Sequence, residues 1–295
     1  MYIKGVWLVL FGLWCPVFSV CAQESAKFNY VDFNGLSLRQ LLGDPPANDS
    51  PQAKAELEEI LEWQRTRTQE QVIRARAEIQ LTPYVFSEVL GSWFNPQNIP
   101  EADALLKKTQ NDLYAILDRA KRLWNRPRPS RQDSRVKPAI EVPRNAAYPS
   151  GHATLGTCLG MILAELAPMY RKALLERAQV IGQDRIIIGV HHPSDVVAGN
   201  KLGAYVAERL LEDAAFRREL TKARQELKPF LNAQSKVRES TTPAGMNSSP
   251  RWRWAASIES MPHGEVDFLA PPGPKISRMT VSATKTLAWP LNKTP

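Results

Sequence analysis

Three of the four histidines in the chain lie in two short segments that also hold other residues able to move protons or bind anions. His191 precedes Asp195 by four residues, so this carboxylate can accept the Nδ1 proton of the imidazole and leave Nε2 as a nucleophile. An alternative stays open, because an aspartate near a helix start also favours the helix macrodipole. We expect His192, the next residue, to be a partly exposed structural histidine.

The third histidine, His152, follows a segment that predicts an anion site, Tyr148-Pro149-Ser150-Gly151. Pro and Gly indicate a turn, and the small residues beyond it predict a helix whose first N–H groups point at whatever lies before them. Ser150 adds a hydroxyl, and Gly151 lets the backbone approach a ligand closely. His152 lies at the rim of this site, where an imidazole can transfer protons near neutral pH.

Three cations accompany these segments. Lys121 and Arg128 stand at the end of a predicted helix and in the loop after it, from which both can reach an anion, and Arg185 precedes His191. Taken alone, such charged residues usually lie on a solvent-exposed surface and have no binding role. We therefore give them weight only together with the histidine segments.

In chain order the three segments read K-x6-R-P, P-S-G-H and R-x5-H-x3-D. This pattern resembles the signature of the type 2 phosphatidic acid phosphatase superfamily, and more closely the bacterial class A non-specific acid phosphatases, over the N-terminal apolar segment and nearly all of residues 30–230. The resemblance implies hydrolysis of small phosphomonoesters at acid pH through a phosphohistidine, without a cofactor. It also implies a homo-oligomer.

The resemblance assigns a role to each matching residue. It implies that His191 attacks phosphorus, that Asp195 orients His191, and that His152 protonates the leaving alkoxide and then activates water. The groups it implies for holding the phosphoryl oxygens are Lys121, Arg128, Arg185, Ser150 and the Gly151 amide. We expect no metal site, because too few other His, Cys or carboxylate clusters remain.

The sequence also departs from this family at two positions. Asp184 stands where the family has serine, and an anion there would oppose a phosphate dianion. Ser130 stands where an aromatic residue is usual, which bears on substrate preference. Three alternatives stay open: a vanadium-dependent haloperoxidase with a similar pocket, a membrane lipid phosphatase, and a non-catalytic exported interaction protein.

Composition limits the class of protein. The chain has 295 residues, of which 43% are hydrophobic and 23% charged, as in ordinary globular proteins. Residues 1–22 combine Lys4, an apolar run and short residues near position 22, which predicts a signal peptide and a periplasmic or secreted protein, with an uncleaved membrane anchor as the alternative. No later run approaches the roughly 18 apolar residues that a membrane span needs. Residues 23–235 carry only +3 of the net charge of +8, which argues against a nucleic-acid partner.

The elements that must position these residues are predicted to be helices. We expect an all-α fold with one compact helical bundle over residues 23–233, and a Pro/Ser/Thr-rich, disordered tail over 234–295. The predicted helices cover about 51–80, 83–91, 100–126, 151–166, 169–189 and 195–228, the last broken near Asp213, with Ser194 as its cap. Candidate core residues of the first helix are Leu57, Ile60, Leu61, Val72 and Ile73.

Overall fold

The computed structural model describes residues 26–241, with side chains placed through residue 234. The predicted signal peptide and residues 242–295 of the predicted tail lie outside the described residues. Within residues 26–241 the chain is helical and holds no strand, which confirms the all-α prediction. The elements in order are α1 (Leu38–Leu42), α2 (Pro51–Thr66), α3 (Gln69–Ala77), the 3₁₀ turn η1 (Pro83–Phe86), α4 (Ser87–Leu90), α5 (Pro100–Trp124), α6 (Pro129–Gln132), α7 (Gly151–Leu166), the 3₁₀ turn η2 (Pro168–Tyr170), α8 (Arg171–Ile187), α9 (Pro193–Glu212) and α10 (Ala214–Thr241).

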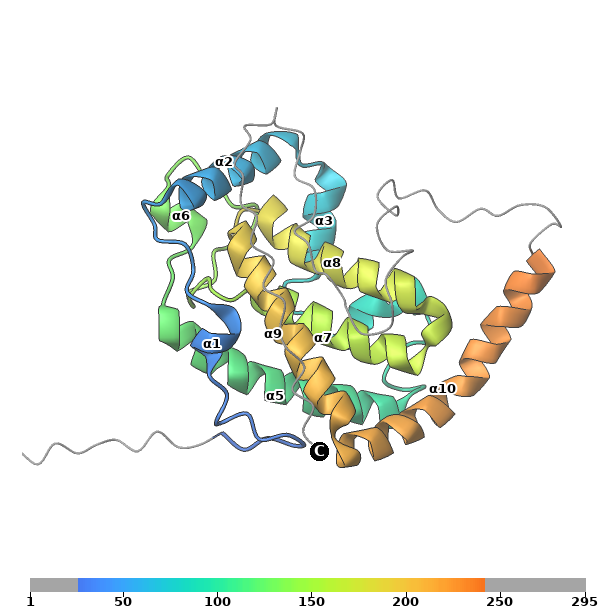
Figure 1. Cartoon of the computed structure of the whole chain (residues 1–295). Helices are drawn as coiled ribbons and strands as arrows, with labels where there is room; N and C mark the ends of the chain where they lie inside the picture. The colour runs from blue at the N-terminus through green and yellow to red at the C-terminus, as the bar shows by residue number, and fades with distance from the viewer. Residues whose placement is uncertain (1–25, 242–295) are drawn as a thin grey trace, which may run out of the picture.

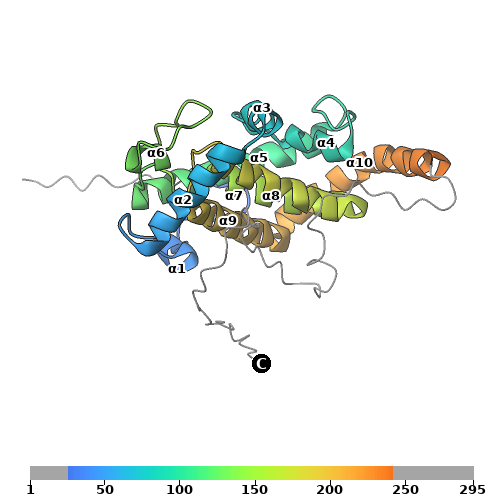
Figure 2. The same ribbon diagram turned by 90° about the horizontal axis from the view of Figure 1, so that it is seen from above.

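Helix α7 is the centre of the molecule and packs most extensively against α8 and α9 (Figures 1 and 2). Two glycines of α9 allow this close approach. A Cβ at Gly199 would lie 2.5 Å from the carbonyl oxygen of Ser150, and one at Gly203 would lie 2.4 Å from that of Thr154. The backbones of α7 and α9 are therefore nearly in contact at the end where α7 begins.

The remaining helices cover this three-helix centre. Helices α5 and α10 pack against each other and enclose the main apolar core (Figure 1). Helix α2 packs on α8 through a smaller cluster that contains Leu57 and Ile60, and α3 packs on the chain after α8 through Ala75. The two smaller clusters place α2 and α3 beside the ends of α7, α8 and α9 that carry the predicted site residues.

The predicted helix over 51–80 is in fact two helices. Ser50 caps α2 and Pro51 occupies its first turn, as expected. Thr68 then caps α3, with its hydroxyl accepting from the backbone of Gln71 while the Gln71 side chain accepts from the backbone of Thr68. This capping box restarts the helix and shifts its buried face, so Val72 is buried but Ile73, predicted for the core, is 58% exposed.

Other predicted boundaries hold. Asn125 adopts the left-handed conformation with φ 45° and ends α5 before the Arg126-Pro127-Arg128-Pro129 segment. The break near Asp213 separates α9 from α10, but α10 continues to Thr241, past the predicted domain end at 233. Among the described residues, no helix combines the length and the apolar character that crossing a membrane requires.

Candidate active site

The predicted site residues come from four helix ends and the loops next to them. Lys121 lies in the last turn of α5 and Arg128 directly precedes α6. Ser150 caps α7, whose first residues are Gly151 and His152. The remaining three lie in the last turn of α8, between α8 and α9, and in the first turn of α9: Arg185, His191 and Asp195.

The partners of His191 fix which ring nitrogen carries the proton. Nε2 lies 2.8 Å from Nη1 of Arg128, and a guanidinium can only donate, so Nε2 must be the unprotonated nitrogen. Nδ1 then carries the proton and donates to Oδ2 of Asp195 at 3.2 Å. The same oxygen accepts the backbone N–H of His192, so Asp195 also serves the start of α9. Asp195 therefore contacts both the His191 ring and the start of α9.

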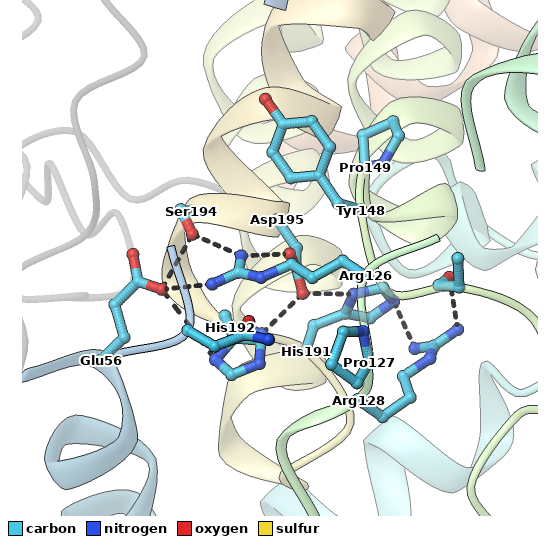
Figure 3. A network of polar contacts seen from close by, with 12 residues as sticks. Glu56, Arg126, Pro127, Arg128, Tyr148, Pro149, His191, His192, Ser194 and Asp195 are labelled. Atoms are coloured by element: carbon cyan, nitrogen blue, oxygen red, sulfur yellow. Dashed lines mark hydrogen bonds and ion pairs between the residues drawn. The ribbon is translucent and has the colours of Figure 1, made fainter. Parts of the chain in front are cut away.

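Lys121 and Arg128 are held in place largely by backbone carbonyls (Figure 3 shows Arg128). Lys121 Nζ donates to the carbonyl oxygens of Ala146 at 2.7 Å and Pro149 at 2.9 Å. Arg128 donates to the Asn145 side chain at 2.7 Å and to the Val190 carbonyl at 2.8 Å. Burial and the charge of Arg128 lower the pKa of Lys121 to about 7, and burial lowers that of Arg128 to about 10.

The start of α7 supplies a hydroxyl and an imidazole. The fully buried Ser150 Oγ accepts the backbone N–H of Ala153 at 3.4 Å, which leaves its own hydrogen free to donate. His152 Nε2 lies 2.8 Å from the carbonyl oxygen of Glu78 and must donate to it, so Nδ1 is the titrating atom. Burial, and then the charge of Arg185, lower the pKa of His152 to about 4.

Arg185 is fully buried, with only part of its guanidinium satisfied. Nη2 donates to the Ala75 carbonyl at 2.9 Å and to Glu78 at 3.0 Å, whereas Nε and Nη1 are buried without a hydrogen-bond partner. Glu78 is also bound by Arg177 at 2.5 Å. Two buried, unpaired donors on one guanidinium are costly unless an acceptor binds there, so Arg185 is suited to receive an anion.

The structure brings these residues together around His191. Burial lowers the pKa of His191 well below its ordinary value, and the charges of Arg128, Lys121, His152 and Arg185 lower it further. The starts of α7 and α9 add their positive dipole ends. The arrangement therefore presents an unprotonated imidazole nitrogen among donors and cations. It could bind a tetrahedral oxyanion and accept its central atom.

Three expectations require correction. His192 is completely buried rather than partly exposed, and burial lowers its pKa to about 4. Ser194 does not cap α9, because that helix begins at Pro193 with His192 as its cap. Asp184 does not confront the site with a free negative charge, since Arg74 binds both of its oxygens at 2.8 and 2.7 Å.

Sequence reasoning missed three residues that contact the site: Glu56, Glu78 and Arg126. Glu56 shares the buried face of α2 with Ala53 and Ile60, and a carboxylate on an apolar face is a usable signal. Arg126 stands in a segment interpreted only as the end of a helix. Nothing in the local sequence marks Glu78, which acts through a backbone carbonyl and through long-range pairs.

Comparison with known proteins identifies the family. Residues 109–217 match the PAP2 superfamily. The chain is 33% identical over 205 residues to the non-specific acid phosphatase of Salmonella typhimurium, which covers 66% of this chain and 82% of that protein. This chain belongs to the non-specific acid phosphatases of the PAP2 superfamily, and the protein is a phosphatase. The resemblance predicted from the motifs is confirmed.

Two further proteins match parts of the chain. The chain is 37% identical over 133 residues to an acid phosphatase of Zymomonas mobilis, which covers 44% of this chain and 50% of that protein. A bacterial vanadium-dependent iodoperoxidase of known structure aligns with 58% of this chain and 52% of its own, with a TM-score of 0.46 and 18% identity. A likeness of that extent says nothing about the reaction.

Within residues 26–241, no group of three or more His, Cys, Asp or Glu side chains is placed to hold a metal ion.

Proposed function

We propose that this phosphatase hydrolyses small phosphate monoesters at acid pH, without a metal, through a phosphohistidine at His191. The observation that carries the proposal is the pair of contacts made by the His191 ring: Nδ1 lies beside the Asp195 carboxylate, and Nε2 lies beside Arg128, which can only donate. A nitrogen nucleophile oriented by a carboxylate fits covalent catalysis.

In the first step, Nε2 of His191 attacks phosphorus and the phosphorus–oxygen bond to the leaving group breaks. His152 gives its Nδ1 proton to the departing alkoxide. Lys121, Arg128, Arg185, Ser150 and the Gly151 amide hold the non-bridging oxygens, where charge is spread in the transition state. Arg128, which touches Nε2 in this structure, moves aside or donates to the incoming phosphoryl oxygens instead.

In the second step, water attacks the phosphorus and the phosphorus–nitrogen bond breaks. His152, now neutral, takes the proton from that water, which restores both histidines and releases inorganic phosphate. The ring of His191 carries a positive charge while it is phosphorylated, and Asp195 compensates that charge through the Nδ1 hydrogen bond.

The charge states of the site favour acid conditions. Lys121 keeps its charge only below about pH 7, and His152 holds its proton only at lower pH. Burial and the neighbouring cations lower the pKa of His191 well below that of free histidine, which favours its neutral form. A periplasmic or extracellular location, proposed from residues 1–22, is tested by fractionating cells that produce the full chain.

The test is hydrolysis of a chromogenic aryl phosphate at acid pH in the presence of a chelator. The purified protein should be active, and His191→Ala should lose activity while binding inorganic phosphate. Full activity in His191→Ala would refute the mechanism, and loss of activity on chelation would refute its metal independence.

The haloperoxidase alternative is not favoured, because the related curated proteins named above are phosphatases. A halide-oxidation assay with vanadate checks it.

A further inference from the structure

Arg126 is a buried arginine, 3% exposed, that the steps above do not use. Its Nη1 donates to Oδ1 of Asp195 at 2.6 Å. The other carboxylate oxygen, Oδ2, accepts from Nδ1 of His191 at 3.2 Å and from the backbone of His192 at 2.8 Å. Arg126 and His191 thus bind different oxygens of one carboxylate (Figure 3).

Two further side chains hold Arg126 itself. Nη1 also donates to Ser194 Oγ at 2.7 Å, and Nη2 donates to Oε2 of Glu56 at 3.2 Å. Ser194 Oγ in turn donates to the same Glu56 oxygen at 2.8 Å. The network links α2, the loop after α5 and the first turn of α9 (Figure 3).

We propose that Arg126, held by Glu56, is a positioning residue that fixes the Asp195 carboxylate in the orientation that His191 needs. The inference rests on the proposed function, because it concerns the same reaction. The terminal torsion of an aspartate is broad, so a carboxylate held through one oxygen can rotate. One held through both oxygens rotates only by breaking a charge-assisted hydrogen bond. Asp195 is held through both, which keeps Nδ1 of His191 as the donor and Nε2 as the nucleophile.

The charges of the network also suit the reaction. Glu56 and Asp195 contribute two negative charges and Arg126 one positive charge, so these three side chains together carry one net negative charge. Attack on phosphorus leaves the ring of His191 positive, and a fixed negative charge stabilises that state. His192, 3.9 Å from Glu56, stays neutral above about pH 4, because burial lowers its pKa. Without Glu56, Arg126 would cancel the charge of Asp195 when the reaction needs it.

A purely structural network would also be buried and paired, so the test must separate the two roles. The phosphate-binding cations are held by other partners, namely backbone carbonyls, Asn145 and Glu78. Loss of positioning should therefore lower kcat and leave KM and competitive inhibition by inorganic phosphate unchanged. A structural defect would lower the free energy of unfolding and disturb both constants.

The experiment measures steady-state kinetics of the full chain carrying Arg126→Gln, Arg126→Lys, Asp195→Asn, or Arg126→Gln with Asp195→Asn. Arg126→Gln should lower kcat about 10- to 100-fold, since a small misplacement of reacting groups has that effect. KM and the inhibition constant of phosphate should stay within about threefold of wild type. Arg126→Lys should recover part of kcat. In the Asp195→Asn background, Arg126→Gln should lower kcat no further, because Arg126 acts through the Asp195 carboxylate.

Two additional variants cover a failure of Arg126→Gln to fold. Ser194→Ala and Glu56→Gln loosen the hold on Arg126 without removing its charge, and each should lower kcat with KM unchanged. Arg119→Gln is the control, because Arg119 binds the carbonyls of Phe33, Asn34 and Leu36 and should not affect kcat.

Three results would overturn the positioning role. They are wild-type kcat in the folded variants, a loss confined to KM, or an equal loss with and without the Asp195 carboxylate. Failure of the proposed function is distinguishable, since it requires activity in His191→Ala. An inactive His191→Ala variant together with full kcat in the Arg126 and Glu56 variants refutes the positioning role alone.

Discussion

At the scale of the residue, hydrogen-bond partners give His191 and His152 different capacities. A carboxylate receives the proton of His191, whereas a backbone carbonyl receives that of His152. The carboxylate can compensate a cation on His191, but the neutral carbonyl cannot do so for His152. His191 is therefore suited to carry a phosphoryl group, and His152 to exchange a proton with the leaving group or water.

The pH dependence of activity follows from the cations around His152. Burial and Arg185 lower its pKa to about 4 in the free protein, so the acid form is lost as the pH rises through that value. A bound phosphate dianion compensates these cations and raises the pKa of His152 in the complex. We expect the alkaline limb of kcat to lie at higher pH than that of kcat/KM, after correction for ionisation of the substrate. Coincident limbs, or a kcat limb at lower pH, would contradict this explanation.

The unpaired donors of Arg185 predict a loss of binding in Arg185→Lys. Lysine keeps the charge but lacks the planar set of donors to which the unpaired Nε and Nη1 belong. KM and the inhibition constant of inorganic phosphate should rise about 10- to 100-fold, which corresponds to about 1.4 to 2.8 kcal/mol. Arg209→Lys, at an exposed ion pair on α9, is the matched control and should change neither constant. Equal constants in the two variants would show that these unpaired donors do not bind phosphate.

At the scale of the element, the contact between α7 and α9 connects packing to the site. The backbone N–H of Ser150 donates to the carbonyl of Asp195 at 2.8 Å, so the two helix starts are hydrogen-bonded to each other. This bond requires the close approach that Gly199 and Gly203 allow. Moving α9 outward would separate Asp195 and His191 from the N-terminal end of α7.

Gly199→Ala tests this connection. The added methyl group would lie 2.5 Å from the Ser150 carbonyl oxygen, so the helices must separate. We expect the free energy of unfolding to fall by about 1–3 kcal/mol, measured by urea denaturation, together with a loss of kcat. Gly35→Ala, where no atom lies within 4 Å of the added carbon, should change stability by less than about 0.5 kcal/mol. Similar stability in the two variants would refute the packing explanation.

Local signals predicted most of the elements and part of the site. Ser50-Pro51 and Ser150-Gly151 indicate helix starts, and the prolines of the Arg126-Pro127-Arg128-Pro129 segment indicate a helix end, because caps and prolines act within a few residues. The pairing of His191 with Asp195 followed from a spacing of four residues. Such rules describe contacts between near neighbours in the chain.

Contacts between distant segments could not be predicted in the same way. Glu56 meets Arg126 across 70 residues, and Glu78 meets Arg185 across 107. Arg74 neutralises Asp184 across 110 residues, so the expected opposition to phosphate was inferred without its partner. The burial of His192 likewise depends on how α2 packs, which its own neighbours do not reveal.

At the scale of the whole molecule, the site and its supporting residues fall between positions 56 and 195. Helix α10 packs against α5 and α9, away from these residues in sequence, and runs to Thr241 (Figure 1). Removal of residues 242–295 should therefore leave kcat/KM for an aryl phosphate within about twofold of the full chain. A loss of activity in a folded truncated protein would show that the predicted tail takes part in catalysis.

The most direct test of the proposed chemistry is to trap the covalent intermediate. The protein is mixed with an aryl phosphate at acid pH and quenched in alkali within one turnover, since phosphohistidine survives base better than acid, and the modified peptide is identified by mass spectrometry. We predict one added phosphoryl group, located on His191, and none on His191→Ala. A phosphoryl group on any other residue, or a product burst from a protein that never gains phosphate, would contradict the mechanism.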